Sequence, residues 1–305
     1  MGRYIIKRVI SAIITIWFIL TLTFILMKAI PGDPFMSPRA MQPEVKAAVY
    51  AKYGLDKPMF EQYITYLTNY LQGDFGVSFK KVGLTTQQII SSGFPYSLKI
   101  GIGASIFIII FGISFGILSA LKQNKIPDRT LMVVSTLGST VPSFVFATLF
   151  LYVFSKKLGW VPSFGVGTLR HYIGPVLCIG MFSLAYVTRL TRTSILDVLQ
   201  QDYIRTARAK GLSEKKVIIK HALRNALIPV VTYLGPMIAG LVTGSFVIEK
   251  VFGIAGIGSL FTTSITNRDY TLIMGITVFF GVFVVVTTLI VDILYIFIDP
   301  RIKYD

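Results

Sequence analysis

The sequence predicts an all-α membrane protein with six transmembrane helices. Of its 305 residues, 53% are hydrophobic and only 14% are charged, and the mean hydropathy is +0.70. This composition is far more apolar than that of an ordinary soluble domain. The hydrocarbon core of a bilayer is ~30 Å thick and requires ~20 apolar residues per helix. Six runs of about this length are present, and their composition favours helices over the strands of a barrel.

The six runs are almost free of charge. They cover residues 9–27, 100–121, 131–155, 172–188, 226–248 and 272–298. Their one acidic or basic side chain is Asp292, near the end of the sixth run. An acid inside a span is costly, so Asp292 is a candidate functional residue. The alternative is that Asp292 is solvated or paired with a basic loop at the membrane surface.

The lysines and arginines between the runs predict the orientation of the chain. With the N-terminus inside, the cytoplasmic segments hold seventeen of these residues and the short exterior loops hold five. Basic residues in short loops favour the cytoplasmic side of a membrane. We therefore expect both termini in the cytoplasm. Much of the formal charge of +16 reflects this bias, which argues against nucleic-acid binding.

The long exterior loop, residues 31–97, is predicted to hold two short helices. Pro43 and Gly54 are residue types that begin and end a helix. A second, amphipathic helix is indicated by apolar residues at helical spacing, namely Phe60, Tyr63, Ile64, Leu67, Tyr70 and Leu71. Its apolar stripe either packs on its own subunit or helps to receive a protein outside the cell.

The segment from Arg189 to Arg224 is too polar to lie in hydrocarbon, because nine of its 36 residues are lysine or arginine. Its first half predicts a helix that continues out of the fourth run, with an apolar stripe of residues four apart: Ile195, Leu199, Tyr203 and Ala207. Gly211 follows where a turn with positive φ is expected.

The second half of this segment predicts another amphipathic helix. Ser213 has the residue type of an N-cap. Ile218, Ala222 and Ala226 repeat every fourth residue, alongside Ile219, Leu223 and Leu227. Two amphipathic helices joined at Gly211 would present a short, rigid knob to the cytoplasm.

These residues resemble the cytoplasmic coupling loop in permease subunits of ABC importers. The family pattern is Glu-Ala-Ala, three residues, then Gly, and Arg205, Thr206, Ala207 and Gly211 occupy those places here. The longer strings DYIRTARAKGLS and HALRNALIPVVT are similar to the peptide and nickel subfamily. Further matches run along the chain: GRYIIKR, PGDPF, YGLDKP, GDFGVSF, PSF, ITNRDY and DPRIK. One departure is Ala255, where relatives commonly have proline.

The resemblance implies a type I ABC importer permease fold and a set of partners. The partners are a homologous second permease subunit, two ATPase subunits that bind ATP and magnesium, and an extracellular substrate-binding lipoprotein. This chain would be a transport subunit rather than an enzyme, and it shows no GxxxxGK[ST] phosphate loop. The implied coupling residues are Asp202, Tyr203, Arg205, Thr206, Ala207, Arg208, Lys210, Gly211 and Leu212. Arg205, Arg208 and Lys210 either pair with ATPase acids or lie near lipid headgroups.

Candidates for the translocation path are fewer. Pro142, Ser143 and Phe144 would kink the third run and face the pathway, or would serve helix packing alone. Glu249, with Lys250 beside it, is either a gate residue or a flanking charge at the exterior interface. Gly240 and Gly244 have a spacing that favours close helix contact. We expect no metal site and no cofactor bound by this chain.

The predicted organisation has four parts. They are an N-terminal helix (1–30), an exterior loop (31–97), a five-helix core (98–298) with the coupling loop at 189–226, and a cytoplasmic tail (299–305). The substrate implied by the resemblance is an oligopeptide, with a dipeptide or a nickel complex as alternatives. A secondary transporter, the alternative of another class, would show more ionisable groups within its spans.

Overall fold

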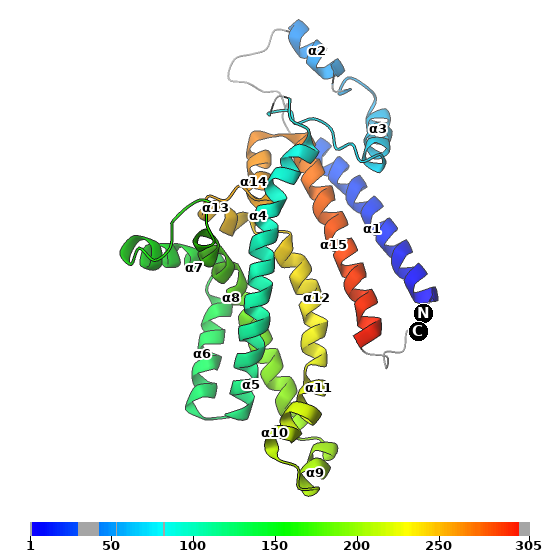
Figure 1. Ribbon diagram of the computed structural model, residues 1–305. Coiled ribbons are helices and arrows are strands. Elements are labelled where there is room, and N and C mark those ends of the chain that lie inside the picture. The colour runs from blue at the N-terminus through cyan, green and yellow to red at the C-terminus, as the bar shows by residue number, and fades with distance from the viewer. Residues whose placement is uncertain (1, 30–42, 53, 82, 299–305) are drawn as a thin grey trace. The chain divides into compact units, whose positions relative to one another are not determined.

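The computed structural model describes residues 2–29, 43–52, 54–81 and 83–298. These residues form helices and one isolated antiparallel bridge, Val77–Thr85, without any strand (Figure 1). The predicted all-α class is therefore confirmed. The PGDPF and DPRIK motifs and the predicted tail, 299–305, lie outside the described residues.

The helices follow one another along nearly all of the described chain. In chain order they are α1 (Gly2–Ala29), α2 (Pro43–Lys52), α3 (Met59–Leu71), α4 (Thr86–Phe107), the π-helical η1 (Ile108–Gly112), α5 (Ile113–Leu121), α6 (Ile126–Thr140), α7 (Ser143–Phe150), the π-helical η2 (Leu151–Lys157), α8 (Arg170–Leu199), α9 (Asp202–Ala209), α10 (Glu214–Lys216), the π-helical η3 (Val217–Ala222), α11 (Leu223–Ala226), α12 (Ile228–Val242), α13 (Phe246–Val251), α14 (Ile257–Asn267) and α15 (Tyr270–Ile298).

Five of the six predicted spans are present as long apolar helical stretches in the described residues. They are Ile6–Ala29, Thr86–Leu121, Arg170–Leu199, Ile228–Val251 and Tyr270–Ile290. The third predicted span differs, because it divides into Ile126–Thr140 and Ser143–Lys157 with a bend of 107° between them. The described residues therefore contain five helices that could cross a membrane, or six if the bent pair crosses as one.

The break in the third span has a local cause at Pro142. A residue before proline is pushed out of the α region into extended backbone. Val141 accordingly has ψ 123°, and Pro142 has ψ 139°. The helix stops at Thr140 and α7 begins again at Ser143. A kink expected from the sequence is thus a complete break.

The chain divides into two compact units. The first contains the residues up to Phe94 and Leu260–Leu289, and the second contains Pro95–Ser259. Within the first unit, one apolar cluster joins α1, α3 and α15 through Leu20, Phe24, Tyr66 and Val278.

The stripe predicted on α3 is only partly buried. Tyr63, Leu67 and Tyr70 pack against that cluster, and the Tyr63 hydroxyl lies 2.7 Å from the Thr21 hydroxyl of α1. Phe60 and Leu71, by contrast, are 73% and 84% exposed in this chain. The interpretation that the stripe packs on its own subunit therefore holds for one side of α3 but not for the other.

The second unit is built around α8. The helices α5, α6, α7 and α12 all pack on it, and Val187 of α8 is completely buried in a cluster with Ala104, Ile108 and Val230. Gly116 of α5 permits a close approach to α8, since a Cβ there would lie 2.4 Å from Cβ of Thr191. Gly240, in contrast, has no heavy atom within 4 Å of an added Cβ. The described residues therefore do not make the close contact predicted at Gly240.

The two glycines make a matched pair for a stability test. Gly116→Ala should force α5 away from α8 and lower the free energy of unfolding by roughly 1–3 kcal/mol, as overpacking does. Gly240→Ala should leave it unchanged or slightly raised. Unfolding of the detergent-purified chain measures both, and equal effects would contradict the packing described.

Candidate functional site

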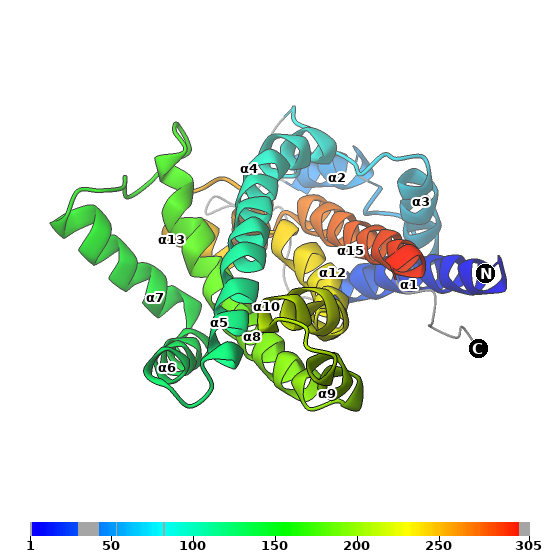
Figure 2. The ribbon, with the colours of Figure 1, turned by 60° about the horizontal axis from the view of Figure 1, so that its bottom comes forward.

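The coupling segment, residues 202–226, lies at one end of the second unit, beyond the turn that joins α5 to α6 (Figure 1). It contains α9, α10, η3 and α11. The helix predicted to continue out of the fourth run does so, but the prediction that it reaches Tyr203 and Ala207 is wrong. Helix α8 ends at Leu199, and Gln201 is extended, with ψ 148°, before α9 begins at Asp202. Figure 2 shows α9 as a separate short helix at the end of α8.

A small apolar core holds the segment together. Ile204 and Ala207 of α9 pack against Val217 and Ala222 of η3, and all four are nearly or completely buried. The fourfold repeat predicted after Gly211 is displaced here, because the π-helical η3 adds one residue to a turn. Val217 is consequently buried in place of Ile218, five residues before Ala222, and Ile219 is 57% exposed. Ala222 and Ala226 are both completely buried, as the fourfold repeat predicts.

The turn between the two halves is formed as predicted. Gly211 has φ +76°, a conformation that glycine adopts without steric cost. Ser213 takes the N-cap position of α10, but its side chain makes no capping hydrogen bond. The turn is instead bridged by Arg208, whose Nε donates to Oε1 of Glu214 at 2.7 Å. The two halves of the segment, before and after Gly211, are thus joined by an ion pair as well as by their apolar core.

Most of the other residues predicted for coupling are exposed. Arg205 donates to Asp202 at 3.3 Å, and both side chains are largely exposed. The Tyr203 hydroxyl accepts a hydrogen bond from Asn225 at 2.9 Å, which ties α9 to α11. Thr206 and Lys210 are exposed, while Leu212 packs against the small core. Two of the three cations proposed to meet ATPase acids are therefore bonded within the segment.

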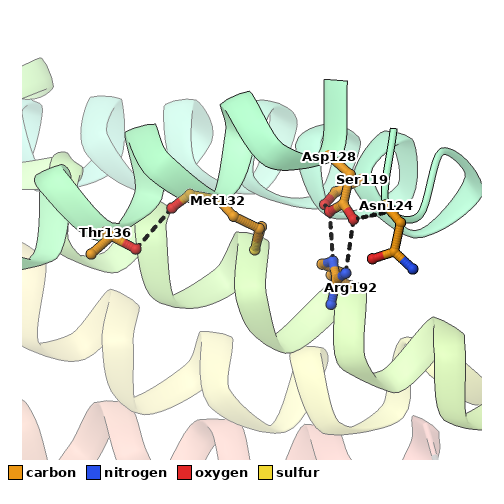
Figure 3. Close-up of polar contacts among 6 residues, drawn as sticks. All are labelled: Ser119, Asn124, Asp128, Met132, Thr136 and Arg192. Carbon is orange, nitrogen blue, oxygen red and sulfur yellow. Dashed lines mark hydrogen bonds and ion pairs between the residues drawn. The ribbon is translucent and has the colours of Figure 1, made fainter. Parts of the chain in front are cut away.

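A buried carboxylate forms a brace between α5, α6 and α8 (Figure 3). Asp128 lies in the first turn of α6 and is 2% exposed. Arg192 of α8 binds it with two hydrogen bonds, from Nε at 2.7 Å and from Nη2 at 2.8 Å. The Ser119 hydroxyl of α5 and the backbone N–H of Asn124, at 2.8 Å, also donate to it. Four donors satisfy both carboxylate oxygens and join α5, α6 and α8.

The brace was not predicted from the sequence. In the sequence Arg192 is one of nine basic residues in its segment, and nothing near Asp128 in the chain indicates its partner. The available signal was an acid at the third position of a helix, directly after a short turn. Such an acid often accepts a backbone N–H from the preceding turn, here that of Asn124. Identifying Arg192 as the partner also requires the knowledge that α6 packs against α8.

The coupling segment is attached to the brace through apolar contacts. Ala120 of α5, Ile195 of α8 and Ala226 of α11 form one buried cluster. Ile195 lies one turn beyond Arg192 on α8 and has no exposed surface. The end of α8, the turn between α5 and α6 and the coupling segment therefore form one packed body.

The candidate path residues lie around the break in the third span. Pro142 and Ser143 contribute to the wall of a cavity of about 340 Å³, while Phe144 is 53% exposed. Non-helical backbone at membrane depth is tolerated where it is buried in protein or lines a cavity. The break between α6 and α7 meets this requirement through the cavity.

Glu249 is buried, with 1% of its surface exposed. It accepts hydrogen bonds from the Ser97 hydroxyl at 2.7 Å and from the backbone N–H of Ser259 at 2.9 Å. Gly244 and Gly256 leave room for the carboxylate, since a Cβ at either would lie within 2.5 Å of a Glu249 oxygen. Glu249 therefore ties α13 to α4 and to the start of α14.

The other predicted features carry less information here. The side chain of Asp292 lies outside the described residues. Among the residues that the structure does describe, no three His, Cys, Asp or Glu side chains gather as metal ligands would.

Removing the brace should destabilise the chain. Asp128→Asn leaves the Arg192 guanidinium without its charged partner, and a broken buried pair costs about 3 kcal/mol of unfolding free energy. Asp202→Asn, which breaks the exposed Arg205 pair, should cause no measurable loss. Chemical denaturation of the purified chain compares the two, and similar stabilities for both variants would contradict the assigned role of Asp128.

Comparisons with known proteins agree with this architecture. Residues 112–304 match the family model "Binding-protein-dependent transport system inner membrane component", and residues 1–100 match the model for the N-terminal part of such components. Among solved structures, the MetNI methionine ABC transporter shares 15% identity with a TM-score of 0.56 over 70% of this chain and 97% of that chain. An amino acid ABC transporter shares 18% identity with a TM-score of 0.54, over 68% and 93% of the two chains.

Curated relatives match along the full length. The oligopeptide transport system permease protein OppB of Haemophilus influenzae is 45% identical over 100% of both chains. OppB of Salmonella typhimurium is 42% identical over 100% of both chains. The dipeptide transport system permease protein DppB of Bacillus subtilis is 44% identical over 99% of this chain and 98% of the relative. The chain therefore belongs to the family of binding-protein-dependent transport system inner membrane components, as a multi-pass permease subunit of a bacterial ABC importer.

Proposed function

We propose that this chain forms one half of the membrane channel of an ATP-driven importer of oligopeptides. The observation that carries the proposal is the coupling segment, a compact body whose outer face is free of contacts from the rest of the described chain. The substrate assignment is supported by the names of the OppB relatives, which are oligopeptide permeases at 42% and 45% identity.

The partners follow from this assignment. A homologous second permease subunit completes the channel, two ATPase subunits bind ATP and magnesium, and an extracellular lipoprotein delivers the peptide. This chain is then a transport subunit, with hydrolysis confined to the ATPases. Lipid surrounds the apolar faces of helices such as α1, where Trp17 and Phe18 are exposed.

The proposed orientation places both termini and the coupling segment in the cytoplasm. The excess of lysine and arginine in the corresponding loops supports it. In this orientation α3 and the buried carboxylate of Glu249 lie toward the exterior, where the binding protein docks.

The mechanism uses the coupling segment as a lever. ATP binding draws the ATPase subunits together, and each carries its coupling segment with it. Because this segment is packed on α8, and α8 is braced to α5 and α6 by Asp128, the displacement reaches the membrane helices. The central cavity of the assembled transporter then opens to the exterior, and ATP hydrolysis reverses the change. A shift between inward-open and outward-open populations from 1:99 to 99:1 requires ~5.5 kcal/mol. A flexible connection between the coupling segment and α8 would transmit less of the ATPase motion to the membrane helices.

A dipeptide is the second candidate substrate. The DppB relative, a dipeptide permease, is 44% identical, which is within the range of the OppB relatives. Competition between dipeptides and longer peptides in transport assays decides between them.

Coupling should depend on the backbone conformation at Gly211. Gly211→Pro fixes φ near −65°, which is incompatible with the observed +76°, and should abolish peptide uptake while ATPase subunits remain active. Gly211→Asn is the control, since asparagine tolerates positive φ better than other side chains. Ala207→Glu should also abolish uptake, because it places a carboxylate in the small apolar core.

The assay is uptake of labelled peptides into vesicles that contain the complete transporter, with ATP and the binding protein present or omitted. We expect uptake to require both. Normal uptake by Gly211→Pro and Ala207→Glu would refute the role of the coupling segment. Uptake by this chain without ATPase subunits would instead indicate a secondary transporter.

A further inference from the structure

Two arginines lie one turn apart on α8 and differ in how their charge is balanced. Arg192 has a carboxylate partner, Asp128. Arg189 donates one hydrogen bond, from Nη1 to the Ser139 hydroxyl at 3.0 Å. No acidic side chain among the described residues lies within ion-pair distance of Arg189. Since guanidinium has five N–H donors, most of those on Arg189 are free to bind another group.

The position of Arg189 makes this imbalance informative. It lies in the second half of Arg170–Leu199, a helical stretch long and apolar enough to cross a membrane. Its partner Ser139 is close to the break in the third span, so the structure brings Arg189, the first residue of the polar segment, beside a span. A charged side chain at such a place faces the protein interior or a water-filled space and marks a path for solutes or ions. The guanidinium of Arg189 is only partly buried, so it is accessible from outside the chain.

Arg189 lies next to the cavity at the break in the third span. Its hydrogen-bond partner, Ser139, is part of the cavity wall, together with Thr140, Ser143 and Ser245. The cavity, about 340 Å³, has the size of a pocket for a small ligand. Its lining includes four hydroxyl groups but no charged side chain. Hydroxyls bond to amide and carboxyl groups without selecting for the side chains of a ligand.

We propose that this cavity and Arg189 form a site for the C-terminal carboxylate of a peptide during its passage through the membrane. The proposal rests on the proposed function and adds a contact that all linear peptides share. Arginine binds carboxylates with two parallel hydrogen bonds, as Arg192 does with Asp128. The hydroxyls of Ser143 and Ser245 then lie where the adjoining peptide backbone passes. Such a site discriminates by the terminal charge and not by the peptide sequence.

A structural role for Arg189 makes a different prediction. Arg189 lies near the carbonyl end of α6, where a positive charge is favourable. If it served only that purpose, replacing it would impair the transport of every substrate equally. A carboxylate site would instead distinguish a peptide with a free C-terminus from its amide.

The experiment uses the complete transporter in vesicles, with the binding protein saturated with either tri-alanine or tri-alanine amide. The measured quantity is the ratio of free-acid uptake to amide uptake. In Arg189→Gln this ratio should fall about tenfold relative to the wild type, because one charge-assisted contact is lost. Arg189→Lys should restore part of it. Arg129→Gln, at an exposed position on α6, is the control and should keep the wild-type ratio.

Four results would overturn the proposal. An equal fall in uptake of both peptides would assign Arg189 to the support of α6. Loss of the second permease subunit from Arg189→Gln preparations would indicate that its partner is an acid of that subunit. Failure of the wild-type transporter to import either peptide would refute the proposed function as well, whereas wild-type uptake with an unchanged ratio in Arg189→Gln would refute this inference alone.

Discussion

The absence of water from the membrane interior is the constraint on which this structure depends. A carboxylate buried between membrane helices, even one near the membrane surface, must likewise receive its hydrogen bonds from the protein, because an unpaired one would cost several kcal/mol. Asp128 receives four and thereby joins three helices. Glu249 receives bonds from α4 and from the start of α14, and two glycines leave space for it. These polar contacts hold helices whose apolar surfaces have little reason to associate in lipid.

The same constraint explains how motion at one end of the second unit can reach its middle. Helix α8 carries the apolar attachment of the coupling segment at Ile195, the brace at Arg192 and the unmatched charge at Arg189, all within two turns. A displacement of the coupling segment therefore acts on the same stretch of helix that borders the cavity. The break at Pro142 gives α6 and α7 different directions at this depth, so that movement of α6 need not carry α7 with it.

Much of this architecture can be predicted from the sequence, for physical reasons that apply locally. Apolar run length identifies the spans, and Gly211 identifies its turn because few residues adopt positive φ. The errors arise where local signals compete or where distant contacts decide. The fourfold stripe through Tyr203 suggested one helix, but the chain breaks at Gln201 so that Ile204 rather than Tyr203 is buried. A π-turn shifts the second stripe. The Asp128–Arg192 pair joins residues 64 apart, and only the packing of α6 on α8 reveals it.

The central claim is that the coupling segment, α8 and the turn between α5 and α6 move as one body. The most direct test places spin labels at Lys125 and Lys215, both exposed, and measures their separation in the assembled transporter with and without ATP. Cys178 is buried and should remain unlabelled. We expect one distance distribution that ATP leaves unchanged, while labels on Lys215 and on the second permease subunit approach each other. A change in the Lys125–Lys215 distance on ATP binding would show that the segment moves independently and would contradict the account.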